Sequence, residues 1–265
     1  MFLITLLALS GFPAYAQDAP VAGPDLSPLK RTGIGRVDQV LDGLTIVLKD
    51  KKIIRLSSID IPDHGAPDGG TINLAAKAAL EKLLPSGTEV LIYQTRMAKT
   101  GRTNRLGQEL AHLVKKEDGT WVNGALVENG YARAMPSDTN PDHAETLYRL
   151  EGKARKANLL LWTDKGWPVL PPERAGEGMG EYRIVQGTVG SAATVKNNLY
   201  LNFGKNWKED FTIMLTPAIR RDLARSGVDP LSLTHKTVRA RGYIRDYNGP
   251  FMEPESALRL EFPTP

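Results

Sequence analysis

The chain has 265 residues, of which 41% are hydrophobic and 24% charged, and it contains no cysteine. This composition is that of a folded protein with one large or two small domains, and it excludes disulfides, thiolate metal sites and a cysteine nucleophile. The net charge of +4 favours polyanionic partners only weakly over neutral ones.

The chain begins with a short apolar run, MFLITLLALSGFPAYAQ. This run is too short to span a membrane because Gly11 and Pro13 interrupt it, and it has the pattern of a secretory signal cleaved after Ala16. No Lys or Arg precedes the run, so an uncleaved anchor or a wrongly assigned start is the alternative. We expect export to the periplasm or the medium, with no membrane insertion of the mature chain.

The elements of the first domain follow in chain order. An Ala- and Pro-rich stretch, residues 17–31, predicts a flexible lead-in. Runs of Val, Ile and Leu with turns between them predict strands over 34–41, 44–49, 52–58, 88–95 and 109–114. Apolar residues at helical spacing predict helices over 71–84, 122–131 and 141–158. This order is typical of a closed five-stranded barrel of the oligonucleotide/oligosaccharide-binding (OB) type, over residues 32–163.

A second domain is predicted beyond a Pro- and Gly-rich linker, residues 164–181. Residues 182–265 repeat the order of three strands, a helix and two strands, and the helix is bounded by Pro217 and Gly227. The predicted fold class is α+β, mainly β, with one barrel and a second, smaller OB-like β domain.

Several motifs in residues 33–162 together resemble the staphylococcal nuclease (thermonuclease) family. The family pattern is Asp-Gly-Asp-Thr, Arg-Leu, Ile-Asp-x-Pro-Glu and Asp-Arg-Tyr-Gly-Arg, followed by two helices. The corresponding motifs here are DGLT (42–45), RL (55–56), IDIPD (59–63), NRLGQ (104–108), WVNGALVENGYA and AETLYRLEGKARKANLLLW. The later segments YLNFGKNWKEDFT and GPFMEPESALRLEF resemble a C-terminal extension found on some exported bacterial members.

The resemblance implies a Ca²⁺-dependent phosphodiesterase. In such a site carboxylates and a backbone carbonyl hold the ion, a Glu activates the attacking water, and two Arg side chains bind the phosphate. By position, the metal ligands are Asp60, Asp42 and the carbonyl of Ile61. Asp63 falls on the Glu position, one methylene shorter, and Arg55 falls on one of the two Arg positions.

Two positions depart from the family pattern. Leu44 stands where the other carboxylate ligand is expected, and Gln108 stands where the second Arg is expected. An isobutyl group offers Ca²⁺ no oxygen, and an amide lacks the charged fork that binds phosphate. The pattern therefore predicts a degenerate catalytic site, that of a pseudoenzyme with little or no activity. Such a site binds Ca²⁺ weakly if at all, and no other cofactor is expected.

Two alternatives stay open for this site. A basic residue of the loop before Gln108 could replace the missing guanidinium; the candidates are Lys99, Arg102 and Arg105. A different site, suited to Zn²⁺ or Mn²⁺, could form from carboxylates and an imidazole in DIPDHGAPD, namely Asp60, Asp63, His64 and Asp68. The simpler interpretation of that segment is a solvated turn.

The second domain offers a strand on which basic and aromatic residues alternate with apolar ones. Strand periodicity places one set on a single face: Arg239, Arg241, Tyr243, Arg245 and Tyr247. The same argument exposes Tyr200 on an earlier strand. Such a face suits single-stranded nucleic acid, since guanidinium groups meet phosphates and Tyr rings stack on bases. The alternative is a solvated outer strand.

The sequence thus predicts an exported monomer of the thermonuclease-like class. It is expected to bind single-stranded DNA or RNA, or another polyanion, through Arg55, Arg102, Arg105 and the second-domain face, without efficient cleavage. Two other functions stay open. One is an active metal-dependent nuclease that hydrolyses DNA or RNA, and the other is an envelope scaffold that binds no nucleic acid.

Export leads to the first prediction. Expression in a bacterium should yield a periplasmic form that begins at Gln17, as measured by N-terminal sequencing or intact mass. A full-length product in the inner membrane would instead support the anchor.

Overall fold

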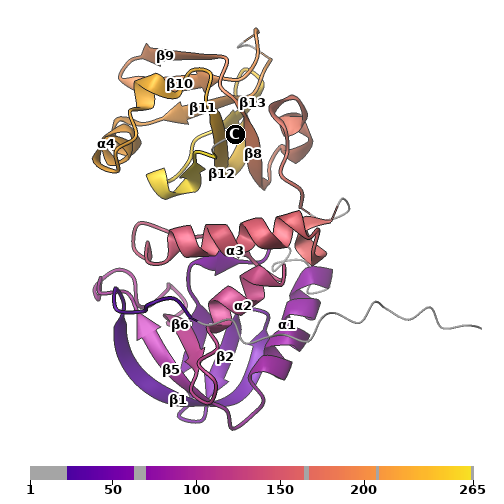
Figure 1. Cartoon of the computed structure of the whole chain (residues 1–265), viewed down its shortest axis with the longest axis vertical. Helices are drawn as coiled ribbons and strands as arrows, with labels where there is room; N and C mark the ends of the chain where they lie inside the picture. Colours follow the sequence, from indigo (N-terminus) through magenta and orange to yellow (C-terminus); the bar gives the residue numbers. More distant parts are fainter. Residues whose placement is uncertain (1–22, 63–69, 164–166, 207–208, 264–265) are drawn as a thin grey trace, which may run out of the picture.

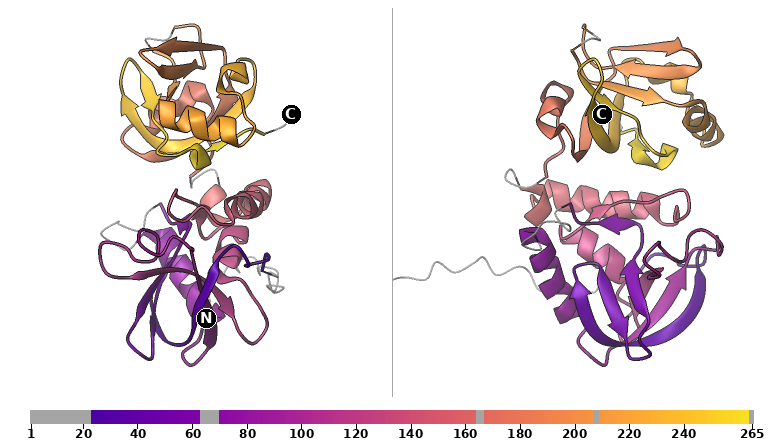
Figure 2. Two further views of the ribbon diagram at one scale, coloured as in Figure 1. Left: turned by 90° about the vertical axis from the view of Figure 1, so that its left-hand side faces the viewer. Right: turned by 180° about the vertical axis from the view of Figure 1, so that it is seen from behind.

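The computed structural model describes residues 23–62, 70–163, 167–206 and 209–263. They form two domains stacked end to end, with helix α3 (Ala144–Lys156) between them in all three views (Figures 1 and 2). The predicted signal sequence lies outside the described residues. Among the described helices, none is long and apolar enough to cross a membrane.

Five strands of the first domain close into a barrel in the order β1-β2-β3-β6-β5. Their bounds are Lys30–Asp42 (β1), Thr45–Leu48 (β2), Ile53–Leu56 (β3), Glu89–Gln94 (β5) and Glu109–Lys115 (β6). β3 and β6 run parallel, and every other neighbouring pair is antiparallel. The prediction of an α+β fold with a closed five-stranded barrel is confirmed.

Helices and two short strands complete the first domain. The helices are α1 (Thr71–Leu83), α2 (Val122–Glu128), α3 and the 3₁₀ turn η1 (Leu160–Trp162), and the short strands β4 (Ile59–Asp60) and β7 (Arg133–Ala134) pair with each other. α3 begins three residues later than the pattern predicts, because His143 at its N-cap has a left-handed backbone with φ of 61°. α1 packs against β1 and buries Ala76 and Leu80.

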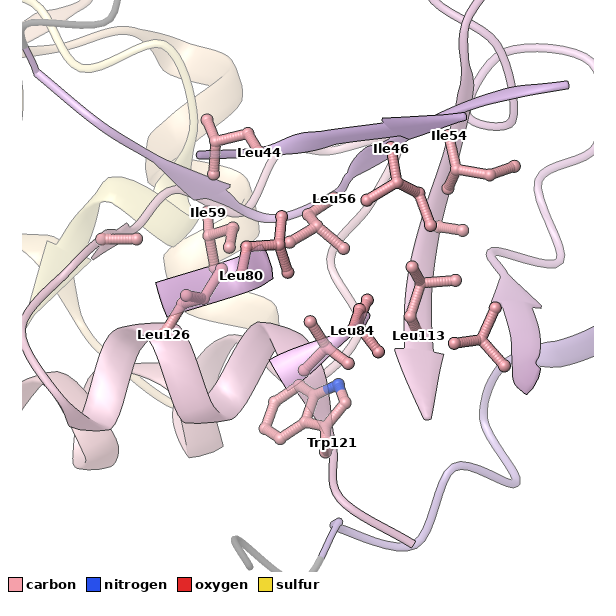
Figure 3. Packing of buried hydrophobic residues seen from close by; sticks show 14 of the residues in the cluster. Leu44, Ile46, Ile54, Leu56, Ile59, Leu80, Leu84, Leu113, Trp121 and Leu126 are labelled. Carbon is pink, nitrogen blue, oxygen red and sulfur yellow. The ribbon is translucent and has the colours of Figure 1, made fainter. Parts of the chain in front are cut away.

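The inward faces of the barrel strands and of α1 and α2 form one hydrophobic core (Figure 3). Trp121 is fully buried there, and its indole N–H donates to Nδ1 of His112 at 3.3 Å. Burial lowers the pKa of His112 to about 3, with a smaller effect from His143. His112 is therefore a neutral acceptor in the core, and it has a structural role.

The second domain is built on a mixed β-sheet. Its elements are β8 (Tyr182–Thr188), β9 (Ser191–Val195), β10 (Asn198–Asn202), β11 (Thr212–Leu215), α4 (Pro217–Arg225), the 3₁₀ turn η3 (Pro230–Leu233), β12 (Thr237–Asp246), β13 (Pro250–Met252), the 3₁₀ turn η4 (Ala257–Arg259) and β14 (Leu260–Glu261). The order is β14-β12-β13-β11-β10-β9, and β8 pairs with β12. The sequence pattern missed β9 and β13. β9 carries a single large apolar residue, Val195, and β13 is only three residues long.

The two domains share their strand connectivity. In the barrel, helix α1 lies between β3 and β5 in the chain, and β3 pairs in parallel with β6. In the second domain, α4 lies between β11 and β12, and β11 pairs in parallel with β13. The pairings β13–β12 and β12–β8 then match β6–β5 and β5–β1. The second domain is therefore OB-like, although within the described residues no ladder joins β8 to the β9–β10 hairpin.

The predicted linker is largely part of the second domain. Leu170 and Ala175 are buried in the second core, and the 3₁₀ segment η2 (Pro172–Gly178) contacts β8 and β12. The Leu170 amide donates to the Ile184 carbonyl at 2.9 Å. The prediction of a loose linker over 164–181 is therefore wrong from Trp167 onward, because Pro and Gly there shape a packed segment.

The predicted lead-in is also packed where the structure describes it. Leu29 is buried, and Leu26 contacts the core of the barrel. The Arg96 guanidinium donates to the carbonyls of Ser27 and Pro28 at 3.0 Å. The prediction of a flexible segment over 17–31 is thus wrong for residues 23–31, since two leucines without helical or strand spacing still reach the core.

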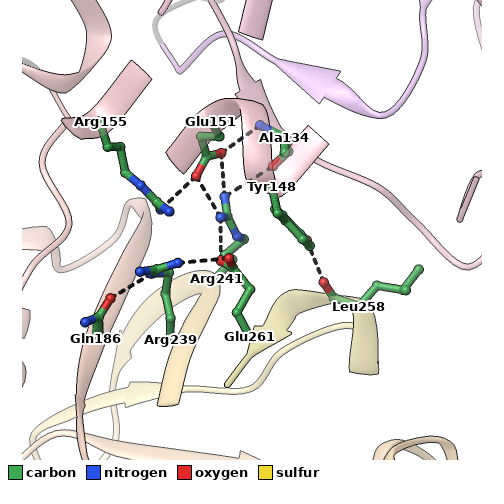
Figure 4. A network of polar contacts seen from close by, with 9 residues as sticks. All are labelled: Ala134, Tyr148, Glu151, Arg155, Gln186, Arg239, Arg241, Leu258 and Glu261. Atoms are coloured by element: carbon green, nitrogen blue, oxygen red, sulfur yellow. Dashed lines mark hydrogen bonds and ion pairs between the residues drawn. The ribbon is translucent and has the colours of Figure 1, made fainter. Parts of the chain in front are cut away.

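A buried ionic network joins the two domains (Figure 4). Arg241 of β12 is fully buried and donates two hydrogen bonds, at 2.7 and 2.8 Å, to the carboxylate of Glu151 on α3. It donates a third, at 2.6 Å, to Glu261 of its own domain, and it lies 4.3 Å from the ring centroid of Tyr148. Arg155 and the Ala134 amide also donate to Glu151, each at 2.8 Å. The charge of the Glu151 carboxylate is therefore balanced by guanidinium groups from both domains.

This network corrects the prediction of an open nucleic-acid-binding face on β12. The alternation is as predicted, but Arg241 faces α3 and is buried. Arg239 is also taken up in the interface, where it donates to Glu261 at 2.9 Å and to Gln186 at 2.8 Å. Only the distal part of the strand is open, with Tyr243 and Arg245 exposed.

The network leads to a stability prediction. Replacing Glu151 with Gln should lower the free energy of unfolding by about 3–5 kcal/mol, because it leaves a buried guanidinium incompletely compensated. The measurement is urea denaturation of wild type and variant at neutral pH. The matched control is Asp222→Asn, which breaks an exposed ion pair to Arg225 and should change stability by no more than about 1 kcal/mol. Equal effects of the two variants would contradict the prediction.

The same network should make stability depend on pH. Burial raises the pKa of Glu151, but Arg241 and Arg155 outweigh burial and hold it below the ordinary value of 4.5. A carboxylate with a lowered pKa in the folded state stabilises the fold above the ordinary value, and this contribution is lost as pH falls through the folded value. The difference in unfolding free energy between wild type and Glu151→Gln should therefore shrink only below pH 4.5.

Candidate functional site

The candidate site lies where β1 turns into β2 and where β3 leads into β4. Gly43 forms the turn, and its amide donates to the side-chain oxygen of Asn73 on α1 at 3.0 Å. A Cβ at this position would lie 2.6 Å from Ile61 and 2.7 Å from Ala76, so only glycine permits this close approach of α1. The turn, α1 and the residue that follows β4 are thereby held together.

Arg55 lies beside this turn, at the position predicted for phosphate binding. It pairs with Thr45 across the β2–β3 ladder, and its Nη1 lies 3.4 Å from the Thr45 hydroxyl. The side chain of Arg55 is half-buried. One of the two expected phosphate-binding groups is thus present at the barrel surface next to the turn.

Leu44 is part of the hydrophobic core. Its side chain is fully buried, and Figure 3 shows it in the same cluster as Ile59 and Leu80. Its amide donates to the Asp42 carboxylate at 2.8 Å. The position expected to supply a metal ligand therefore supplies packing, and one oxygen of Asp42 fixes the turn.

Asp60 is bound by an arginine that the sequence analysis did not single out. Cross-strand pairing of β4 with β7 places Arg133 directly opposite Asp60. The guanidinium donates two hydrogen bonds to one carboxylate oxygen, from Nη2 at 2.7 Å and from Nε at 3.0 Å. Only 6% of the Arg133 side chain is exposed, against 23% for Asp60. A buried cation thus occupies the side of Asp60 that faces the protein.

Arg133 in turn contacts the second domain. It donates to the backbone carbonyl of Tyr182 at 3.1 Å, and its guanidinium lies 4.4 Å from the centroid of the Tyr182 ring. Asp60 is therefore linked through Arg133 to β8. The position of Arg133 within the motif VENGYARA gives no sign of this contact, because its partner lies 49 residues further along the chain.

Gln108 is fixed by its own loop. Its side-chain oxygen accepts a hydrogen bond from the side-chain nitrogen of Asn104 at 2.7 Å, and its backbone N–H donates to the side-chain oxygen of Asn104 at 3.0 Å. Nearby, Arg102 is half-buried and donates to the Thr95 carbonyl at 2.8 Å, whereas Arg105 is exposed. Of the three basic candidates for the position of the second Arg, Lys99 and Arg105 are exposed, and Arg102 is engaged with the Thr95 carbonyl.

The remaining predicted residues fall in separate places. Tyr200 lies half-buried on the second domain, in a region remote in sequence from the barrel motifs. Asp63, and the alternative ligands His64 and Asp68, lie outside the described residues. Within the ranges that are described, no group of three or more His, Asp or Glu side chains is placed to hold a metal ion.

The described residues do not fit a Ca²⁺ ion. The ion needs about 6–8 oxygen ligands and a local excess of negative charge. Here Leu44 contributes no oxygen, and the charge of Asp60 is compensated by Arg133 at 2.7 Å. A metal-assisted catalytic step at this site therefore has no support in the residues that the structure describes.

The closed five-stranded barrel defines this part of the chain as an OB-type domain. Residues 53–164 match the family model of staphylococcal nuclease homologues, and this domain belongs to that family. The match starts at β3, so the turn with Leu44 lies before it. No curated protein matches the chain.

The burial of Leu44 leads to a prediction. Leu44→Asp should lower the free energy of unfolding by about 3 kcal/mol or more, since it removes a core side chain and buries a carboxylate. Denaturant titration would measure the loss. The matched control is Leu41→Asp on β1, where the leucine is 41% exposed and the change should stay within about 0.5 kcal/mol. A mild effect at both positions would contradict the prediction and would mean that residue 44 can reach solvent.

Proposed function

We propose that this protein is exported, binds single-stranded nucleic acid with its nuclease-family barrel, and cleaves it weakly or not at all. The observation that carries the proposal is the ion pair between Asp60 and Arg133, with N–O distances of 2.7 and 3.0 Å. Together with the buried Leu44, this pair leaves the described part of the site with less negative charge and fewer oxygens than a divalent metal needs.

Binding without cleavage is supported by the groups that the site retains. Phosphate recognition needs guanidinium donors and a positive surface, but not a metal. Arg55 stands beside the turn, and Arg105 is exposed on the loop that leads into β6. The net charge of +4 is compatible with a polyanionic partner. In this proposal the two guanidinium groups contact phosphate oxygens of one strand.

The proposal is tested with single-stranded DNA and RNA oligonucleotides. No cleavage should appear with added Ca²⁺, and calorimetry should detect no Ca²⁺ binding tighter than about millimolar. Fluorescence anisotropy should detect binding that weakens with salt. Cleavage that is abolished by Asp60→Ala would overturn the inactive site, and it would establish the protein as an active nuclease.

Two variants locate the binding surface. Arg55→Ala and Arg105→Ala should each weaken binding and reduce the slope of log K against log salt by about 0.7 per lost phosphate contact. Arg36→Ala is the control, because Arg36 is an exposed barrel arginine that pairs with Glu89 and lies outside the candidate site. If oligonucleotides bind but neither variant differs from wild type, the binding surface lies elsewhere and the proposed role of Arg55 and Arg105 is wrong. If no oligonucleotide binds, the envelope scaffold becomes the better interpretation.

A further inference from the structure

The second domain carries a groove on its sheet, where β9, β10, β11 and β13 lie side by side. These strands and the β12–β13 turn form the end of the molecule away from the barrel (Figures 1 and 2). The groove has a volume of about 390 Å³ and is lined by Ala193, Val195, Tyr200, Asn202, Thr212, Tyr247, Asn248 and Phe251. This volume lies in the range of small-ligand sites.

Strand register places the floor of the groove on one face of the sheet. Asn202 pairs with Thr212, and Thr212 pairs with Phe251, so the three side chains lie in a row across β10, β11 and β13. Tyr200 lies two residues before Asn202 on the same face and is half-buried. The opposite face carries the buried Leu199 and Leu201, as the sequence alternation predicts.

Aromatic rings form the apolar part of the groove. Tyr247 is 62% exposed and meets Phe251 edge to face, with ring centroids 5.2 Å apart. Phe251 packs against the Tyr247 ring and is itself only 7% exposed. The Tyr247 ring is thus packed on one side and exposed on the rest, so it offers a flat apolar surface to a ligand and leaves the groove open.

Side-chain amides form the polar part. Asn202 accepts a hydrogen bond from Thr212 at 3.1 Å, and its amide nitrogen lies 3.4 Å from the Ser191 hydroxyl. Asn248 sits at the tip of the β12–β13 turn with φ of 53°, next to Gly249 with φ of 86°. Each amide offers both donors and acceptors, which is the combination that a hydroxyl group needs.

None of the eight lining side chains is a carboxylate, an ammonium or a guanidinium. A groove for single-stranded nucleic acid needs positive charge along the path of the phosphates in addition to stacking rings. Arg245 lies on the same face, because it pairs with Phe251, but it is not part of the lining. The uncharged lining therefore fits a neutral ligand better than a polyanion.

We propose that this groove binds a neutral oligosaccharide. A sugar ring has apolar C–H faces, which pack on the Tyr247 and Tyr200 rings, and equatorial hydroxyls, which bond to the amides of Asn202 and Asn248. OB-type domains use the corresponding strands and turn to bind either oligonucleotides or oligosaccharides, so the lining decides between the two. The proposed site is independent of the barrel.

The test uses the full chain and four probes: the N-acetylglucosamine tetramer, cellotetraose, maltotetraose and an oligothymidine. At least one saccharide should bind in calorimetry, and NMR shift changes should map to the groove residues. Tyr247→Ala and Tyr200→Ala should each weaken that binding roughly tenfold, the scale of a lost aromatic contact. Tyr247 is mostly exposed, so its variant should stay folded.

The matched control is Tyr243→Ala on the same strand. Tyr243 is 53% exposed and contacts Tyr182 instead of the groove, so its variant should bind the saccharide as wild type does. Two outcomes would overturn the proposal. One is that no saccharide binds, and the other is that oligothymidine shifts the groove residues and loses affinity with Tyr247→Ala. Neither outcome bears on nucleic-acid binding by Arg55 and Arg105 of the barrel.

Discussion

The buried pairing of Arg241 with Glu151 is the interaction on which the arrangement of the two domains depends. Both side chains are fully inaccessible, and they come from different domains. Two charges removed from water are stable only when their hydrogen bonds are satisfied, which the contacts from Glu261, Arg155 and the Ala134 amide help to do. An apolar contact tolerates sliding, whereas this geometry favours one docking of β12 against α3.

The docking has a consequence for the barrel. Because β8 pairs with β12 along seven residue pairs, fixing β12 on α3 also fixes Tyr182 at the start of β8. Tyr182 then accepts a hydrogen bond from Arg133 and stacks on it, and Arg133 binds Asp60. The second domain is thus coupled to the candidate nuclease site through one arginine. A Pro- and Gly-rich connection that packs from Trp167 onward is consistent with this close association.

Much of the fold could be predicted from local sequence, but the interface could not. Apolar alternation and turn residues gave the barrel strands, and the motif DGLT located the turn with Leu44. Alternation on β12 correctly separated two faces of the strand. It could not say which face another domain covers, because Arg241 and Glu151 are 90 residues apart and each is locally typical of a solvated position. Likewise, Asp60 and Arg133 are 73 residues apart.

The contacts of Asp60 limit what substitutions elsewhere in the site could achieve. Restoring a carboxylate at residue 44 and an arginine at residue 108 would supply the missing groups, yet Asp60 would still be held by Arg133. Removing Arg133 would free Asp60, but it would also leave the Tyr182 carbonyl without this donor and its ring without this cation. A metal ion at Asp60 would therefore have to share this carboxylate with Arg133, the residue that also contacts the second domain. Leu44 in the core would offer such an ion no oxygen, so the described contacts around Asp60 serve packing and docking of the second domain.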